Sequence, residues 1–385
     1  MAHSSNRIPS LDGFRAISIL LVVYGHLCGT HGFPVSIVNY SHSLGDVAHL
    51  GVLVFFVISG FLITSLLMSE REKTGSISLK QFYFRRVLRI FPAFYALILV
   101  VFLASLLGWI SLNGRDFAFA LTYTINYDAY RSWQVGHLWS LSIEEQFYLL
   151  WPLALLALRE RRALVVAIVA IFTAPLVRAG ISWLGRGHPH SPLHGIVVFP
   201  AMCDYLATGC ALALLRPWLL AQGWYVRLTA SPWLLATVPV ILVITRFSNH
   251  ALVLLFCSPL LNVCIALLIE SSTRHDGTLA GRFLNWKPVA FVGVLSYSLY
   301  LWQQLFLDRD SNQWINAFPQ NIVFAVVAAL LSYFLIERSF LGFRHRLERA
   351  ARLPRHVDGV GPATDAQEWV AKRLADTKAG NPPVV

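Results

Sequence analysis

Apolar stretches close to the length of a membrane span recur along almost the whole chain, and they constrain its fold more than any other feature. A helix of about 20 apolar residues crosses a hydrocarbon core of about 30 Å. Only 13% of the 385 residues are charged, which is about half the share that is usual in soluble proteins. Unbroken apolar runs favour helices over a membrane β-barrel. The sequence therefore predicts an all-α, polytopic membrane protein.

The positions of the arginines and lysines set the number and direction of the spans. With the N-terminus inside, the inside loops carry most of the positive charge. The short apolar piece 117–125 is assigned as re-entrant or interfacial, because counting it as a span would put the Arg159–Arg162 cluster outside. We therefore expect about ten transmembrane helices, with both ends cytoplasmic. The spans are assigned to 14–29, 49–68, 87–109, 140–158, 163–184, 195–215, 231–247, 250–270, 288–307 and 319–341.

Two further features of the composition narrow the possibilities. Residues 345–385 are polar and rich in Arg, Ala and Pro, so we expect a membrane domain over 1–344 and a loosely ordered cytoplasmic tail over 345–385. A net charge of +11 would indicate nucleic-acid binding in a soluble chain, but here the charge lies in short loops that set topology. The five cysteines form no C-x-x-C pair, and no metal site is expected.

An arginine and a histidine stand at the two ends of the first predicted span, LDGFRAISILLVVYGH. Arg15 and His26 are eleven positions apart, which corresponds to about 20° beyond three helical turns and a rise of about 16 Å. Both side chains therefore lie on one helix face. Ionisable groups inside a membrane usually face a bundle interior or a wet cavity, so the pair indicates a functional site. The alternative is that Arg15 reaches the interface and that a neighbouring helix satisfies His26.

A second cluster, HLWSLSIEEQFY, opens the fourth predicted span. Helical spacing places Ser140, Glu144 and Tyr148 on one face. Glu144 and Glu145 precede an apolar run, and a carboxylate near the membrane centre costs a few kcal/mol unless it has a partner. The two glutamates therefore indicate a polar cavity or a positive partner. The alternative is an interfacial cap in which they favour the positive helix N-terminus.

Three arginines begin the third predicted span in KQFYFRRVLRIFP. Arg86 and Arg89 share a helical face, and Arg85 joins Arg89 at i,i+4. Clustered guanidinium groups bind phosphates with paired donors. The predicted topology puts them at the cytoplasmic face, where a phosphorylated donor would be. The alternative is contact with lipid headgroups together with topology signalling.

In this combination and order, the segments resemble the membrane acyltransferase-3 family of bacterial integral-membrane O-acyltransferases. The resemblance runs from about Ile8 to Phe343 and is carried by LDGFRAISILLVVYGH, GVLVFFVISGFLI, FYFRRVLRIFPAF, HLWSLSIEEQFYLLWPL, SYSLYLW and YFLIERSF. It implies an enzyme of the bacterial cytoplasmic (inner) membrane. Such an enzyme transfers an acyl group from acyl-CoA to a hydroxyl of a surface polysaccharide, a glycolipid or a glycosylated metabolite.

The resemblance also implies roles for individual residues. The Arg-x10-His signature of the family corresponds to Arg15 and His26, and its arginine pair corresponds to Arg86 and Arg89. The Trp-Ser-x-x-x-Glu-Glu-Gln stretch corresponds to Trp139, Ser140, Glu144, Glu145 and Gln146.

At two positions the sequence departs from the family. Gln303 stands where a histidine is common, so no function is carried over to it. Met202 stands where an arginine often precedes the acid of the sixth span, which here is Asp204. This second departure weakens a sugar-binding role for Asp204.

We expect His26 to act as the general base, because an imidazole titrates near neutral pH. Glu144 or Glu145 would orient its ring or bind acceptor hydroxyls. The expected substrate-binding residues are Arg15, Arg85, Arg86, Arg89, Trp139, Ser140 and Gln146. Direct transfer and a transient acyl-His26 intermediate both fit this set.

No bound cofactor is expected, and acyl-CoA, with acetyl-CoA as the expected form, is a substrate. The expected partners are a carbohydrate acceptor, the bilayer and other enzymes of glycan assembly. Some relatives carry a fused hydrolase-like domain for which this chain is too short, so acceptor handling is expected in the membrane domain or through a partner. The alternative function is a transporter or flippase for a lipid-linked sugar. A proton-coupled sensor or scaffold would explain the buried charges but not the arginine loop.

Overall fold

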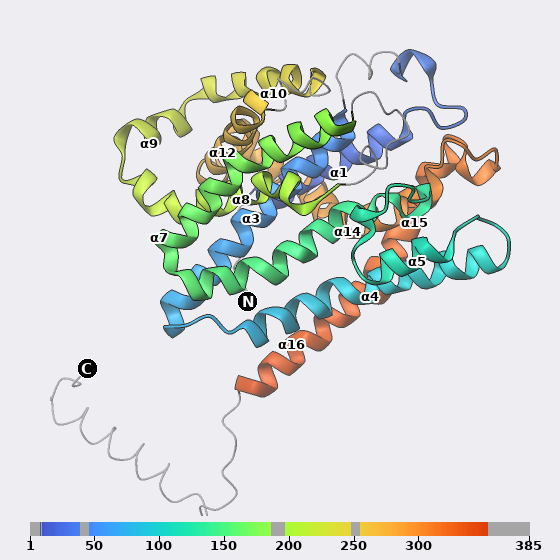
Figure 1. Ribbon diagram of the computed structural model, residues 1–385, viewed down its shortest axis with the longest axis horizontal. Coiled ribbons are helices and arrows are strands. Elements are labelled where there is room, and N and C mark those ends of the chain that lie inside the picture. The colour runs from blue at the N-terminus through green and yellow to red at the C-terminus, as the bar shows by residue number, and fades with distance from the viewer. Residues whose placement is uncertain (1–7, 9, 39–45, 186–196, 248–254, 353–385) are drawn as a thin grey trace, which may run out of the picture. The chain divides into compact units, whose positions relative to one another are not determined.

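The computed structural model describes residues 8, 10–38, 46–185, 197–247 and 255–352 (Figure 1). Helices make up most of these ranges, and no β-strand occurs in them, so the predicted all-α class is confirmed. The chain divides into two units, Met1–Leu341 and Gly342–Val385. All candidate site residues lie in the first unit.

The helices follow one another along the chain with short connections. They are α1 (Leu11–Leu27), α3 (Val47–Thr74), α4 (Leu79–Leu106), α5 (Gly114–Leu121), η1 (Ile125–Tyr127), α6 (Trp133–Gly136), α7 (Leu138–Gly185), α8 (Phe199–Leu220), α9 (Gly223–Ala230), η3 (Pro232–Ala236), α10 (Thr237–Arg246), α12 (Ser258–Arg274), α13 (Leu279–Leu284), α14 (Lys287–Phe306), η4 (Trp314–Asn316), α15 (Gln320–Leu331), the π-helical η5 (Ser332–Glu337) and α16 (Arg338–Arg352).

Among the described residues, five helical segments are long and apolar enough to cross a membrane. They are α3, α4, Trp133–Gly185, α14 and Gln320–Glu348. A sixth candidate is the pair Gly223–Ala230 and Pro232–Arg246, which is bent by 66°. The helices α1 and α12 of the predicted spans have 17 residues each and are shorter than these. The structure thus supports a multi-pass membrane protein with five or six clear spans, which is fewer than the ten predicted.

A break inside α7 explains one pair of predicted spans. Arg159 has a φ of 55° and a ψ of 166°, so two helices meet at this residue. The break falls in the Arg159–Arg162 cluster, which the sequence places in a loop between two spans. The short α5 has 8 residues and extends over only about 12 Å, which is too short to cross a bilayer. Of the predicted tail, residues 345–352 belong to α16, and 353–385 lie outside the described residues.

Glycines allow the helices of the first unit to pack closely. The helix α1 packs against α3 and α14, and α8 packs against both α3 and α7. A Cβ added at Gly60 would overlap the backbone of Leu206 in α8, and one at Gly51 would overlap the carbonyl of Ser18 in α1. Small residues let helices approach one another in this way. The core of α3 is correspondingly dry, with Phe56 and Phe61 almost fully buried.

Candidate active site

Two neighbouring cavities contain most of the predicted site residues. The larger, with a volume of about 690 Å³, is lined by His26, His49 and His137, and we call it the histidine cavity. The smaller, of about 100 Å³, is lined by Arg15, Arg86 and Arg89, and we call it the arginine cavity. Val52 and Tyr300 line both cavities. Groups bound in the two cavities therefore lie on opposite sides of the same pair of side chains.

The histidine cavity holds His26 in a defined orientation. His26 lies in the last turn of α1, and its Nδ1–H donates to the side-chain oxygen of Gln303 at 2.9 Å. An amide oxygen can only accept, so Nδ1 carries the proton and Nε2 is the basic nitrogen of the neutral ring. The ring of Trp133 packs edge-on against the imidazole at a centroid distance of 5.5 Å. Gln303 itself is fully buried.

Gln303 is a residue that sequence reasoning passed over. It stands 277 positions from His26 in the chain, and the family comparison in the sequence gave it no role because it replaces a common histidine. That same replacement was the available signal, because a histidine and a glutamine can both bond to a neighbouring imidazole.

Hydrogen bonds connect the wall between the cavities. The hydroxyl of Tyr300 donates to the carbonyl oxygen of His137 at 2.7 Å, and Ser140 Oγ lies 2.5 Å from the same hydroxyl. The Nε2–H of His137 donates to the carbonyl oxygen of Leu301 at 3.1 Å. These contacts fix the start of α7 against α14. Ser140 lines the arginine cavity, as predicted from its helical face.

The arginine cavity brings together two groups that the sequence singled out separately. Arg15 comes from α1, whereas Arg86 and Arg89 come from α4. The guanidinium of Arg86 lies 4.7 Å above the ring of Tyr148, and such stacking leaves the edge donors of the fork available to a ligand. Glu144 lines the same cavity and accepts a hydrogen bond from Ser59 Oγ at 2.7 Å. The cavity is therefore rich in positive charge and contains one carboxylate among its described lining residues.

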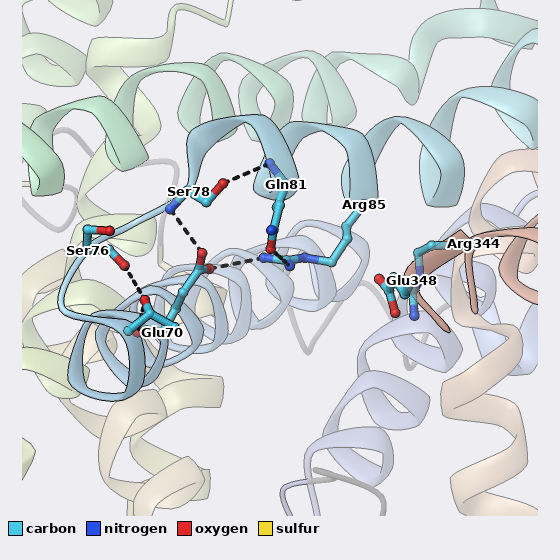
Figure 2. A network of polar contacts seen from close by, with 8 residues as sticks. Glu70, Ser76, Ser78, Gln81, Arg85, Arg344 and Glu348 are labelled. Atoms are coloured by element: carbon cyan, nitrogen blue, oxygen red, sulfur yellow. Dashed lines mark hydrogen bonds and ion pairs between the residues drawn. The ribbon is translucent and has the colours of Figure 1, made fainter. Parts of the chain in front are cut away.

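Arg85 lies outside the described lining of both cavities (Figure 2). Its Nη2 lies 3.1 Å from Glu70 Oε2, and the second oxygen of Glu70 accepts from the backbone N–H of Ser78 at 3.0 Å. Ser78 is in turn the N-cap of α4. In this position Arg85 fixes the connection between α3 and α4.

The remaining predicted residues are divided between the histidine cavity and the surroundings of α7. Trp139 lines the histidine cavity and stacks on His49 at a centroid distance of 6.0 Å. Gln146 donates to Asn126 Oδ1 at 3.0 Å and so holds η1 against α7. Glu145 lines neither cavity, and its Oε1 is buried without a hydrogen-bond partner among the described residues.

Asp204 has the cationic partner that the sequence did not reveal. Arg178 of α7 binds both oxygens of the Asp204 carboxylate, at 2.7 and 2.8 Å. Asn262 of α12 donates to the same carboxylate at 3.1 Å. The guanidinium that is missing at position 202 is thus supplied by another helix. Within the described ranges, no three His, Cys, Asp or Glu side chains come together as metal ligands.

Comparison with known proteins places the chain in a family. The acyltransferase-3 model, described as an acyltransferase domain, matches residues 8–337. The peptidoglycan O-acetyltransferase OatA of Listeria monocytogenes is 28% identical over 364 residues, which cover 88% of this chain and 55% of the relative. The O-acetyltransferase OatA of Staphylococcus aureus is 31% identical over 362 residues, with 88% and 57% covered. The chain thus spans little more than half the length of these relatives, and no solved structure matches it. On the family match, the chain belongs to the acyltransferase-3 family.

Proposed function

We propose that this chain transfers an acetyl group from acetyl-CoA to a hydroxyl of a sugar-containing acceptor, in the cytoplasmic membrane of a bacterium. The observation that carries the proposal is the shared wall of the two cavities, with arginines on one side and an oriented His26 on the other. Relatives that are named as peptidoglycan O-acetyltransferases support acetyl as the acyl group and a glycan as the acceptor.

In this proposal the arginine cavity receives the phosphates of coenzyme A. Arg15, Arg86 and Arg89 converge there from two helices, and guanidinium groups bind phosphate oxygens with paired donors. Arg85 is the weakest member of the predicted set, because it would have to leave Glu70 to join them. Glu144 would hold the arginines apart and limit their mutual repulsion when the donor is absent.

The reaction that follows is a direct transfer. The acceptor oxygen attacks the carbonyl carbon of the thioester while His26 Nε2 takes the hydroxyl proton. The carbon–sulfur bond then breaks, and coenzyme A leaves as a thiolate that takes up the proton from the imidazolium. Gln303 positions the ring for this step, because it keeps the proton on Nδ1 and so leaves Nε2 basic.

The other predicted residues would act through position. Trp139 offers an aromatic face in the histidine cavity on which a sugar ring can lie. Ser140 joins the wall with Tyr300. Gln146 would hold the loop before α6 in place, and Glu145, which is buried near it on α7, would act on Arg86 electrostatically.

For the membrane topology, we propose about ten spans with both ends cytoplasmic, since this arrangement keeps the arginine clusters of the inside loops together. The N-terminal end of α4, with Arg85 and Arg86, then faces the cytoplasm, where acetyl-CoA is made available. The tail that follows the membrane domain would be cytoplasmic as well.

The test is acetyl transfer by the full chain in nanodiscs, with radiolabelled acetyl-CoA and a panel of glycan acceptors. We expect label in the glycan with the wild type and with His31→Ala, a control in which an exposed histidine outside both linings is removed. We expect no transfer with His26→Ala. Sugar movement across sealed vesicles without any acetyl-CoA turnover would overturn the proposal in favour of a transporter.

A further inference from the structure

Three arginines line the histidine cavity, and they come from three separate parts of the chain. Arg131 lies in the loop before α6, Arg246 ends α10, and Arg309 follows α14. Among the described lining residues only Asp46 carries a carboxylate, and that carboxylate accepts from the backbone N–H of His49 at 2.9 Å as the N-cap of α3. The described wall of the cavity thus has more fixed positive than negative charge.

Topology does not account for these arginines. In the predicted orientation Arg131 and Arg309 lie in outside loops, where the positive-inside rule disfavours arginine. A cavity that is lined by one sign of charge concentrates ligands of the opposite sign. Burial also lowers the pKa of the Arg131 guanidinium, although nearby Asp128 raises it in part. An anion beside Arg131 would offset this cost of burial, whereas a neutral sugar would not.

Arg309 ties the positive charge to the proposed reaction centre. Its guanidinium lies 5.5 Å from the ring of Trp133, and the same ring contacts the imidazole of His26 at 5.5 Å. Arg309 also donates to the carbonyl oxygens of Gly25 at 2.5 Å and His26 at 3.4 Å. The guanidinium is therefore fixed at the end of α1, within the reach of one sugar residue from His26.

From this arrangement we propose that the acceptor carries an anionic group, a carboxylate or a phosphate, close to the hydroxyl that is acetylated. Arg131, Arg246 and Arg309 bind that group, the faces of Trp133 and Trp139 receive the sugar ring, and His26 receives the hydroxyl. The inference rests on the proposed function and names the acceptor class for it. Guanidinium groups suit both anions, because their planar forks match carboxylate and phosphate oxygens.

The test uses two matched pairs of acceptors with the full chain in nanodiscs of neutral lipid. One pair is a uronic-acid oligosaccharide and its carboxamide, and the other is a phosphorylated sugar and its unphosphorylated form. We expect kcat/KM for acetyl transfer to favour the anionic member of at least one pair by about tenfold or more, the effect of a charge-assisted hydrogen bond. The pair that shows the preference identifies carboxylate or phosphate as the ligand.

Substitutions then assign the preference to the three arginines. Arg131→Gln, Arg246→Gln and Arg309→Gln should each reduce it while leaving KM for acetyl-CoA unchanged, and Arg309→Lys should restore part of it by keeping the charge. Arg227→Gln, at an exposed arginine outside both linings, is the matched control. A preference that persists in all three variants would overturn the assignment to these residues.

Equilibrium binding of the same labelled acceptors separates this inference from the proposed function. Preferential binding of an anionic member that weakens in the arginine variants supports the site, even when no acetyl group is transferred. Equal binding and equal acetylation of charged and neutral members would overturn the anionic site, while the transferase function would stand.

Discussion

Replacing Gln303 by methionine tests whether the orientation of His26 matters for the reaction. The substitution keeps the length of the side chain but removes the oxygen that accepts from His26 Nδ1–H at 2.9 Å. A neutral hydrogen bond of this kind contributes about 1 kcal/mol, so the productive tautomer would lose about fivefold in population. The ring would also lose its fixed orientation. A general base supplies about 10²–10⁴-fold in rate, and we expect kcat to fall by about 10- to 100-fold.

The same structure predicts what Gln303→Met should leave unchanged. The KM for acetyl-CoA should be that of the wild type, because no residue of the arginine cavity is altered. Stability should change by less than about 1 kcal/mol, since the lost hydrogen bond is offset by removal of the amide nitrogen, which is buried without a partner among the described residues. Gln303→Glu keeps an acceptor oxygen and should recover activity.

Steady-state kinetics with acetyl-CoA as the varied substrate, together with a thermal melt in detergent, decide the matter. An unchanged kcat in a folded Gln303→Met protein would refute the argument that Gln303 orients the base. A raised KM for acetyl-CoA with an unchanged kcat would instead place Gln303 in donor binding.

Three further substitutions test other parts of the account. Arg86→Gln should raise KM for acetyl-CoA by about tenfold or more by removing a charge-assisted contact, whereas Arg85→Gln should change it far less, because Arg85 is bound outside the cavity; initial rates over a range of donor concentrations measure both. Asp204→Asn should destabilise the fold by about 3–5 kcal/mol, because it leaves the buried guanidinium of Arg178 without its counter-charge. Thermal melts should show this loss, and a melting temperature within error of the wild type would contradict it. Gly60→Ala should also lower the melting temperature, since the added methyl group meets the backbone of α8, and an unchanged melt would mean that the two helices can separate at little cost.

Local patterns in the sequence predicted the helical class and the placement of several site residues. The spacing of Arg15 and His26 depends only on the geometry of one helix, and the structure places each of them on a cavity wall. The same holds for Arg86 and Arg89, which follow one another at i,i+3 and line the same cavity. Patterns of this range can be followed along the chain without knowledge of the packing.

Contacts between distant helices could not be predicted in this way. The partner of His26 lies on α14, and the partner of Asp204 lies on α7. Which helices become neighbours depends on packing over the whole domain, as in the close approach of α3 and α8. The number of clear spans was overestimated for a related physical reason. Helices that carry buried polar groups, such as α8 with Asp204, are less apolar than a span that faces lipid on all sides.

The most direct test of the central claim is equilibrium binding of labelled acetyl-CoA to the full chain in nanodiscs. The account assigns the donor to the arginine cavity and the base to the histidine cavity. His26→Ala should therefore bind acetyl-CoA within about twofold of the wild type, whereas the double variant Arg86→Gln/Arg89→Gln should lose affinity by about tenfold or more. Normal binding by the arginine variant, or loss of binding in His26→Ala alone, would contradict the division of the site into these two cavities.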